Sequence, residues 1–285
     1  MFSILFAWHL TRPMNAMRRS FDRVARGDLG VRLWPALRLR RDELTEVAKE
    51  FDLMVERLQQ LVEGREQLLH DVSHELRSPL ARIQMAIGLA EQRPEKASDA
   101  LARIRLETER MDRMIGELLT LSRAEQGHGL EQSHYDLLAL VETVVQDARF
   151  EAQQSGVEIG LEEALGEGCL LLGHAELVRC AVENVVRNAL RFSQSGQMVS
   201  VRLLRLGQEV QLSIADRGPG VEEGKLAGIF DPFVRIGSPR MGKGYGLGLA
   251  IARKAVILQG GTIQARNRAQ GGLRVTMTLP LHDPS

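Results

Sequence analysis

Apolar residues recur at alternating spacings of three and four in the N-terminal part of this 285-residue chain. This is the spacing of a coiled-coil seam, in which a helix buries its apolar residues against a partner helix. The seams are Met14, Met17, Phe21 and Val24, then Leu44, Val47, Phe51, Met54, Leu58 and Leu61, and finally Leu101, Ile104, Met111, Ile115 and Leu118 with Thr108 at one seam position. Short helices cannot bury such seams alone, so we expect bundles made by two chains.

The first two seams belong to separate helices. Residues 26–30 contain two glycines, which end the first helix, and Pro35 lies in the extended connector that follows. Asp42 and Glu43 precede the second seam, where carboxylates favour a helix start. Residues 11–62 are therefore expected to form an all-α parallel bundle with a second chain.

The third and fourth helices predict a hairpin. A third helix is expected from about residue 62 to residue 92, the turn at residues 92–98, and a fourth helix over the last seam. Two such hairpins form a four-helix bundle. Residues 63–126 are expected to be this dimerisation module, and the polar, glycine-containing residues 127–134 to be a linker.

The pattern changes to mixed α and β over residues 135–285. Apolar residues alternate with polar ones at 199–203 and 210–214, and Gly207 and Gln208 lie between, which is typical of a β-hairpin. Further strands are expected at 157–161, 169–172, 262–267 and 273–279, and helices at 137–154, at 174–192 and from about Gly246. This predicts an α+β domain of ordinary size.

Composition narrows the class of protein. The chain has 37 basic and 37 acidic residues, so its formal net charge does not suggest a nucleic-acid partner. Its two cysteines, Cys169 and Cys180, lack metal-site spacing and fit a reduced compartment. Residues 1–10 are mostly apolar and are followed by Arg12, Arg18 and Arg19. They read as the inner end of a transmembrane helix with a basic cytoplasmic flank, or as a buried helix turn.

The third helix carries an unusual polar run, "HDVSHELRSPL". His74 can act as a nucleophile because free imidazole titrates at about 6.5 and is largely neutral at cytosolic pH. Glu75 could accept its proton, and Ser78 lies one turn further along the same face. Pro79 cannot donate its N–H and would bend the helix. A single helix histidine is more often an ordinary surface or core residue.

Two glycine-rich segments predict a ligand site. Asp216 ends a strand and is followed by Gly218 and Gly220, so a carboxylate and a close backbone turn could meet a flat ligand. The segment "GKGYGLGLAI" leads glycines into a helix, whose free N–H groups bind anions. Each segment alone also fits a plain glycine-rich turn.

A polar helix face completes the set. Asn184 and Asn188 are four residues apart and share a face with Arg191, whereas Val178, Val182, Val185 and Ala189 form a separate apolar face. Amide oxygens suit a magnesium ion that also touches phosphates. Arg191 could hold a phosphate, and Phe192 could lie against a base. A polar helix face without a ligand is the plain alternative.

Together these segments resemble the sensor histidine kinases of two-component systems over nearly the whole chain. "SHELRSPL" resembles the phosphoacceptor box, "ENVVRNALRFS" the N box, "DRGPG" and "GYGLGLAI" the two glycine boxes, and "FDPFVR" the F box. Residues from Arg12 and Pro13 to Glu43 resemble a HAMP relay. The residues of these motifs are most similar to those of the Cpx-type envelope-stress kinases.

The resemblance implies a fold and a set of site residues. The fold would be a HAMP bundle and a four-helix dimerisation bundle, followed by a Bergerat-type (GHKL) ATP-binding sandwich over residues 135–285. Asn188 would be the principal Mg²⁺ ligand with Asn184 beside it, and Asp216 would contact the adenine amine. The residues expected at ATP are Asn184, Asn188, Arg191, Phe192, Asp216, Gly218, Gly220, Phe230, Arg235, Lys243, Gly244, Gly246, Leu247, Gly248 and Leu249, although Lys243 could instead be solvated.

The implied activity is ATP-dependent phosphorylation of His74 and transfer of the phosphoryl group to an aspartate of a response regulator, of winged-helix transcription-factor type by family analogy. Ser78 stands where the family uses threonine or asparagine, so phosphatase activity towards the regulator is also expected. The chain would be the cytoplasmic portion of a homodimeric bacterial inner-membrane protein. The alternatives are a scaffold that binds nucleotide without turnover, or an ATPase of the gyrase or chaperone type, which lacks the histidine hairpin.

Overall fold

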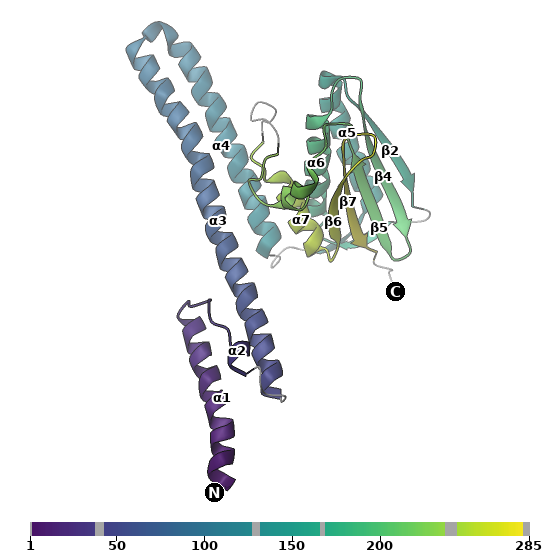
Figure 1. The fold of residues 1–285 in the computed structure, drawn as a ribbon. Coiled ribbons are helices and arrows are strands. Elements are labelled where there is room, and N and C mark those ends of the chain that lie inside the picture. Colours follow the sequence, from purple (N-terminus) through teal and green to yellow (C-terminus); the bar gives the residue numbers. More distant parts are fainter. Residues whose placement is uncertain (1, 38–42, 127–131, 166–168, 237–243, 282–285) are drawn as a thin grey trace. The chain divides into compact units, whose positions relative to one another are not determined.

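The computed structural model describes residues 2–37, 43–126, 132–165, 169–236 and 244–281. The chain divides into two compact units, Met1–Glu75 and Leu76–Ser285. Figure 1 labels the helices and strands of both units.

The first unit is helical. It contains α1 (Phe2–Ala25), α2 (Trp34–Leu37) and the start of α3 (Glu43–Gln92). The expected glycine stop is confirmed, since Gly27 has φ +90° and its N–H donates to the carbonyl of Val24 over 2.9 Å. The expected extended connector includes one short helical turn, α2, in which Pro35 takes an early position that proline tolerates.

The second and third expected helices form one helix, α3. Its 50 residues continue through Gly64 and remain helical on both sides of Pro79. An isolated glycine costs a helix only about 1 kcal/mol, so it did not interrupt the run of helix-forming residues.

The connector packs onto α3 and gives this unit a small core. Its buried residues are Val31, Leu33, Leu37, Ala48, Phe51 and Val55. The N–H groups of Leu33 and Trp34 donate to the carboxylate of Asp52 over 2.5 and 3.0 Å, so one acidic side chain fixes the connector backbone. Phe21 of α1 meets Phe51 edge-on, with ring centroids 4.6 Å apart.

Part of each expected seam stays exposed in the single chain. Leu61 is 69% exposed, and Met14, Met54 and Leu58 are also exposed. Exposed residues at coiled-coil spacing agree with the expectation that a second chain covers them.

The second unit begins with a helical hairpin. The rest of α3 is joined to α4 (Ala97–Gln126) by the short turn η1 (Pro94–Lys96), as expected. Glu107 of α4 is buried and accepts hydrogen bonds from Arg82 of α3 over 2.8 Å and from Arg110 over 2.7 Å. The buried carboxylate is therefore paired on both oxygens and links the two helices.

The remainder of the second unit is an α+β domain, as expected. A five-stranded sheet has the order β2-β4-β5-β7-β6, in which only β2 and β4 are parallel. Its strands are β2 (Glu158–Ala164), β4 (Met198–Leu206), β5 (Glu209–Ala215), β6 (Thr262–Asn267) and β7 (Leu273–Pro280).

A separate two-stranded sheet corrects the expected linker at residues 127–134. Residues 127–131 lie outside the described part of the chain, but Ser133 and His134 belong to β1 (Ser133–Asp136), which pairs with β3 (Leu170–Gly173). The strand depends on a partner far along the chain, so a short polar segment did not reveal it.

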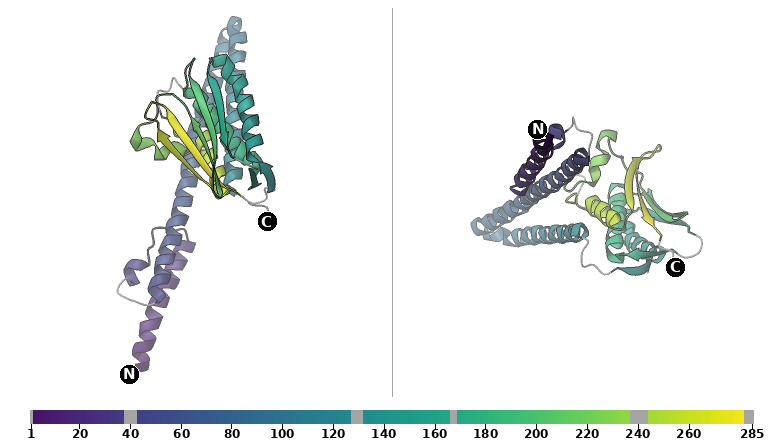
Figure 2. Two further views of the ribbon diagram at one scale, coloured as in Figure 1. Left: turned by 90° about the vertical axis from the view of Figure 1, so that its right-hand side faces the viewer. Right: turned by 90° about the horizontal axis from the view of Figure 1, so that it is seen from below.

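Three helices cover one face of the large sheet (Figure 2). They are α5 (Leu137–Ser155), α6 (Ala175–Phe192) and α7 (Gly248–Leu258). Alternate strand residues such as Val201 and Leu212 are buried beneath them, whereas Arg202 and Ser213 lie on the uncovered face. Asp136 caps α5 by accepting from the N–H groups of Leu138 and Ala139.

Among the described residues, no helix has the length and apolar content needed to cross a membrane. The expectation that residues 1–10 end a membrane helix stays a prediction.

Candidate functional site

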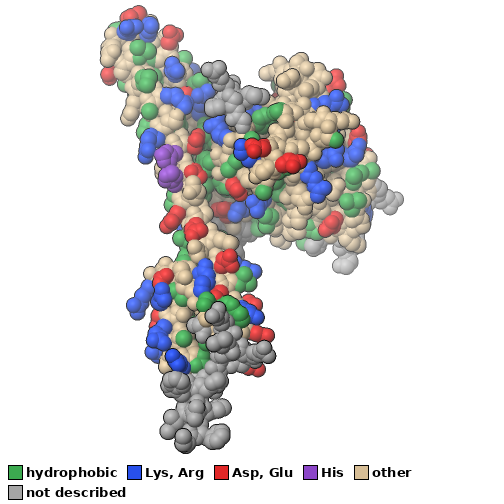
Figure 3. All heavy atoms as spheres, in the orientation of Figure 1, with side chains coloured by type: hydrophobic (Ala, Val, Ile, Leu, Met, Phe, Trp, Pro, Cys, Tyr) green, Lys and Arg blue, Asp and Glu red, His purple; other side chains and the backbone are tan. Residues whose placement is uncertain are grey.

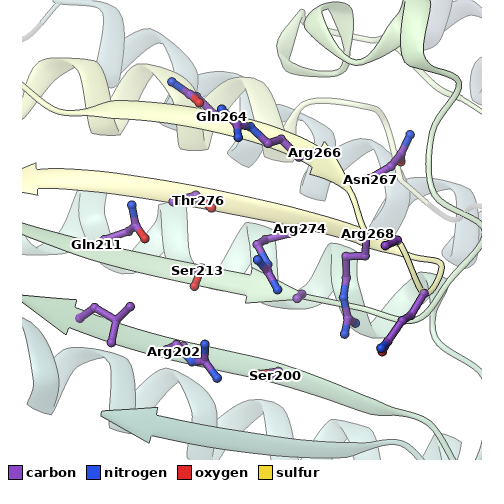
Figure 4. Close-up of a pocket in the computed structure, with 14 residues that line it drawn as sticks. Ser200, Arg202, Gln211, Ser213, Gln264, Arg266, Asn267, Arg268, Arg274 and Thr276 are labelled. Carbon is purple, nitrogen blue, oxygen red and sulfur yellow. The ribbon is translucent and has the colours of Figure 1, made fainter. Parts of the chain in front are cut away.

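Two of the concave surfaces formed by the described residues lie on the second unit. One, of about 790 Å³, lies on the uncovered face of the sheet and is lined by outward side chains of β4, β5, β6 and β7. Arg266 of β6 lies directly opposite Arg274 of β7, and Arg202 and Arg268 are on the same surface (Figure 4). None of the expected site residues lines this surface.

The other pocket, of about 830 Å³, brings most of the expected ATP residues together. They come from segments far apart in sequence, at the C-terminal end of α6, after β5 and before α7. The expected residues that line it are Asn184, Asn188, Arg191, Phe192, Asp216, Gly220, Arg235, Gly244, Gly246, Gly248 and Leu249.

Asp216 lies at the end of β5 and is only 4% exposed. Its Oδ1 accepts hydrogen bonds from the N–H groups of Gly218 over 2.8 Å and Leu273 over 3.1 Å. Among the described residues, none donates a hydrogen bond to Oδ2. Burial raises the pKa of this carboxyl, and the backbone hydrogen bonds and Arg268 oppose that rise. The backbone thus fixes one oxygen, and the other is available to a donor in the pocket.

Gly218 does not line the pocket, but the backbone around it requires a glycine. A Cβ at this position would lie 2.6 Å from the carbonyl oxygen of Phe192 and 3.1 Å from Oδ1 of Asp216. Gly246 is constrained in a similar way, since its φ is +78° and a Cβ would lie 2.7 Å from the carbonyl oxygen of Val234. The glycines therefore let three backbone segments meet around the pocket.

The two asparagines lie one turn apart on α6, as expected. The apolar face of the helix, including Val182 and Val185, is buried, while Asn184 and Asn188 are half-buried and line the pocket. A Cβ on Gly248, the first residue of α7, would lie 3.1 Å from Oδ1 of Asn184. The amide oxygen of Asn184 thus lies beside the N-terminus of α7, where free N–H groups favour anions.

Two of the guanidinium groups that line the pocket belong to Arg191 and Arg235. Burial lowers the pKa of Arg191, and the positive charge of Arg235 lowers it further. The Arg191 guanidinium also lies 5.5 Å from the centre of the Phe192 ring. Two cations that repel each other in a concave site would both be stabilised by a polyanion placed between them.

Besides Gly218, three expected ATP residues are located elsewhere or lie outside the described part. Phe230 is buried in the hydrophobic core of the domain, and Leu247 is fully buried, so neither side chain lines the pocket. Lys243 lies outside the described residues. A motif identifies a segment, but alternate residues of that segment point into the core.

Residues that the motifs did not indicate also line the pocket. Arg113 and Glu117 come from α4, and Glu151 and Arg187 from α5 and α6. Burial raises the pKa of Glu117, and Arg113 and Arg187 oppose that rise. No sequence signal could have identified Arg113 and Glu117, because only the packing of α4 against the domain places them there, whereas Arg187 lies within the N-box segment, three residues after Asn184.

Tyr245 also links the pocket to α4. It is a pocket residue, and its hydroxyl donates to the carbonyl oxygen of Arg110 over 2.6 Å. The glycine-rich segment that enters α7 is therefore attached to the hairpin at this point.

The phosphoacceptor candidates lie on α3. His74 is exposed, and its Nε2 lies 3.2 Å from Nε2 of His70. Glu75 is half-buried. Ser78 is exposed, and its hydroxyl accepts a hydrogen bond from Arg82 over 2.6 Å.

Comparisons with known proteins match this arrangement in three parts. Residues 5–60 match the HAMP domain, residues 64–127 the His Kinase A (phospho-acceptor) domain, and residues 173–283 the histidine kinase-, DNA gyrase B- and HSP90-like ATPase family. These regions contain the first helical bundle, the His74 hairpin and most of the pocket.

Named relatives agree. The chain is 34% identical over 281 residues to the sensor histidine kinase CpxA of Escherichia coli K12, which covers 98% of this chain and 60% of CpxA. It is 32% identical over 286 residues to the sensor protein CutS of Streptomyces coelicolor, covering 98% of this chain and 68% of CutS. The histidine kinase ThkA, solved in complex with the response regulator TrrA, shares the fold with a TM-score of 0.62 at 21% identity over 85% of this chain and 68% of that chain. This chain thus spans about 60% of the length of the CpxA proteins that it matches. On the identity to CutS and the three matched domains, it belongs to the sensor histidine kinases, with an ATP-binding domain of the kind named above.

Proposed function

We propose that this chain uses ATP to phosphorylate itself on His74 and then transfers the phosphoryl group to an aspartate of a response regulator. The observation that carries this proposal is the pocket that joins a fixed carboxylate, two amide side chains and two arginines next to a helix N-terminus. Each of these groups suits a different part of ATP.

The adenine end is assigned to Asp216. Its free oxygen can accept a hydrogen bond from the exocyclic amine of adenine, because Oδ1 is already occupied by two backbone N–H groups. Phe192 supplies an aromatic surface nearby.

The phosphate end of ATP is assigned to two arginines and a helix N-terminus. Arg191 and Arg235 supply positive charge, and the N-terminus of α7 begins at Gly248 beside Asn184.

Asn188 and Asn184 fit a magnesium ion. Their amide oxygens are half-buried in the pocket, one turn apart, and leave room for the waters that this ion retains. A magnesium ion held there would neutralise charge on the phosphates and so favour phosphoryl transfer.

At His74 we assign the attack to Nε2, the ring nitrogen farthest from the helix backbone. Its lone pair forms the bond to the γ-phosphorus while the bond to the bridging oxygen breaks, and ADP leaves with that electron pair. The proton on the other ring nitrogen passes to Glu75 or to water. Transfer to the regulator exchanges this P–N bond for a bond to an aspartate oxygen.

The same hairpin is also proposed to dephosphorylate the response regulator. Ser78 carries the hydroxyl that would orient a water for hydrolysis of the phospho-aspartate, and Arg82 holds that hydroxyl by a hydrogen bond. Pro79 would allow α3 to bend, so that the hairpin could change shape between the kinase reaction and the phosphatase reaction.

The assembly is proposed to be a homodimer in a bacterial inner membrane. Exposed apolar residues on α3 and α4, including Leu69, Leu101 and Ile115, support a four-helix bundle. The HAMP match and the similarity to CpxA support attachment through a membrane segment. The solved complex of ThkA with a response regulator supports that class of partner, and we propose the winged-helix type.

One experiment separates this activity from its alternatives. Incubation with γ-labelled ATP and Mg²⁺ is expected to leave acid-labile, base-stable label on the chain, as phosphohistidine does, and none without Mg²⁺. A nucleotide-binding scaffold would retain no label. A gyrase-type or chaperone-type ATPase would release labelled phosphate but keep none on the protein.

A further inference from the structure

The imidazole rings of His70 and His74 form a close pair on α3. Their Nε2 atoms lie 3.2 Å apart, the ring centroids are 4.4 Å apart, and the ring planes are inclined by 56°. Both residues are exposed, and histidine side chains form a visible cluster on the side of the long helix (Figure 3). The two nitrogens therefore converge at the surface, where a ligand can reach both.

The spacing suits a metal ion. Zinc binds histidine nitrogen at about 2.0–2.1 Å, and a tetrahedral angle then sets two such nitrogens about 3.3–3.4 Å apart. The observed 3.2 Å is close to this value. Residues four apart on a helix face the same side, so the backbone holds the two rings near this geometry.

A neighbouring carboxylate favours the tautomer of His70 in which Nε2 is free to bind a metal ion. Oδ1 of Asp71 lies 3.7 Å from Nδ1 of His70, and Gln67 donates to that oxygen over 2.9 Å. A negative charge beside Nδ1 favours a proton on that nitrogen and leaves the lone pair on Nε2. Metal-binding histidines commonly have a carboxylate in this position.

We propose that His70 and His74 form a two-histidine site for a divalent late transition metal ion such as Zn²⁺. Water completes its coordination. The ion occupies the lone pair of the same Nε2 that attacks ATP, so bound metal and phosphorylation of His74 exclude each other. This second part rests on the proposed function, whereas the metal site itself does not.

The number of ligands suits a reversible site. The described residues contain no cluster of three or more histidine, cysteine, aspartate or glutamate side chains. Structural zinc sites use four protein ligands, so a pair with water gives a weaker, exchangeable site. Mg²⁺ prefers oxygen ligands and does not compete, so the two metals act at separate places on the chain.

The first test measures metal binding directly. Equilibrium dialysis of the chain against Zn²⁺, with Mg²⁺ in excess, is expected to show one zinc ion per chain that is lost in both His70→Gln and His74→Gln. Asp71→Asn is expected to weaken zinc binding by about tenfold, the lower end for loss of an outer-shell partner. His134→Gln, which removes an exposed histidine on β1, is the matched control and retains binding. Unchanged zinc binding in His70→Gln would overturn the site.

The second test measures whether bound zinc prevents phosphorylation of His74. Zinc is expected to suppress labelling of the native chain by γ-labelled ATP and to lose this effect in His70→Gln, with each protein compared with its own metal-free rate. Suppression that persists in His70→Gln would overturn the proposal that bound metal blocks phosphorylation of His74. If the native chain takes up no label at all, the proposed function fails, and the dialysis result still decides the metal site.

Discussion

The N–H of Gly218 donates to Oδ1 of Asp216 over 2.8 Å, and this bond orients the buried carboxylate that the end of β5 contributes to the pocket. Gly218 is thus a residue that shapes the site without lining it. The two residues of one motif therefore have different roles. Asp216 is the group proposed to contact the ligand, and the backbone of Gly218 orients its carboxylate.

Asp216→Asn is expected to weaken ATP binding. The amide can still accept from Gly218 and Leu273 through its oxygen, but it then presents an NH₂ group to the adenine amine, and two donors face each other. An unsatisfied polar pair costs about 1–3 kcal/mol, or roughly fivefold to 150-fold in affinity. Calorimetric titration with ATP measures this change. Asp147→Asn, an exposed residue on α5, is the matched control, and equal affinity in the two variants would contradict the assignment.

Gly218→Ala is expected to disrupt the same site through the backbone. The new Cβ would lie 2.6 Å from the carbonyl oxygen of Phe192, so the turn must move and carry Asp216 with it. ATP affinity should fall while the far-ultraviolet circular dichroism of the domain stays native. Gly224→Ala introduces the same methyl group where no described atom lies within 4 Å, and this variant should bind ATP normally. Normal binding by both variants would show that the close approach is unimportant.

The sequence predicted the class of almost every element of the second unit. Period-two alternation located β4 and β5, and the separate apolar face of α6 left Asn184 and Asn188 on the pocket side. Those patterns are local, so a single segment carries them.

Long-range contacts explain what the sequence did not predict. The strand β1 exists because residues 170–173 pair with it, and Glu117 enters the pocket because α4 packs against α7. Two expected residues, Phe230 and Leu247, do not line the pocket, because their side chains are buried in the core. Neighbouring residues in a motif need not point the same way.

Glu117 is expected to make stability depend on pH. Burial raises its pKa in the folded chain above its unfolded value, so the folded state holds the proton more tightly. The free energy of unfolding should therefore fall as pH rises from the ordinary carboxyl range through the raised pKa. Glu117→Gln removes this component. Urea denaturation across that pH range measures the difference, and identical pH slopes for native and variant chains would contradict the assignment.

Arg266→Thr is expected to stabilise the domain. Arg266 and Arg274 are directly opposite on β6 and β7, and like charges in that position are unfavourable. Threonine suits a strand and removes the repulsion, so the gain should be about 0.2–1 kcal/mol. Salt should reduce the gain, since it screens charges at the surface. Thermal unfolding at low and high salt tests this, and a variant that is less stable at low salt would refute it.

Phosphorylation of the His74 side chain is the central claim, and mapping of the phosphorylated residue tests it most directly. The native chain and His74→Gln are incubated with ATP and Mg²⁺, digested at neutral to basic pH so that phosphohistidine survives, and analysed by mass spectrometry. We expect phosphate on His74 in the native chain and no phosphorylated peptide in His74→Gln. Phosphate on His70 or on any other residue of the native chain, or phosphate that persists in His74→Gln, would contradict it.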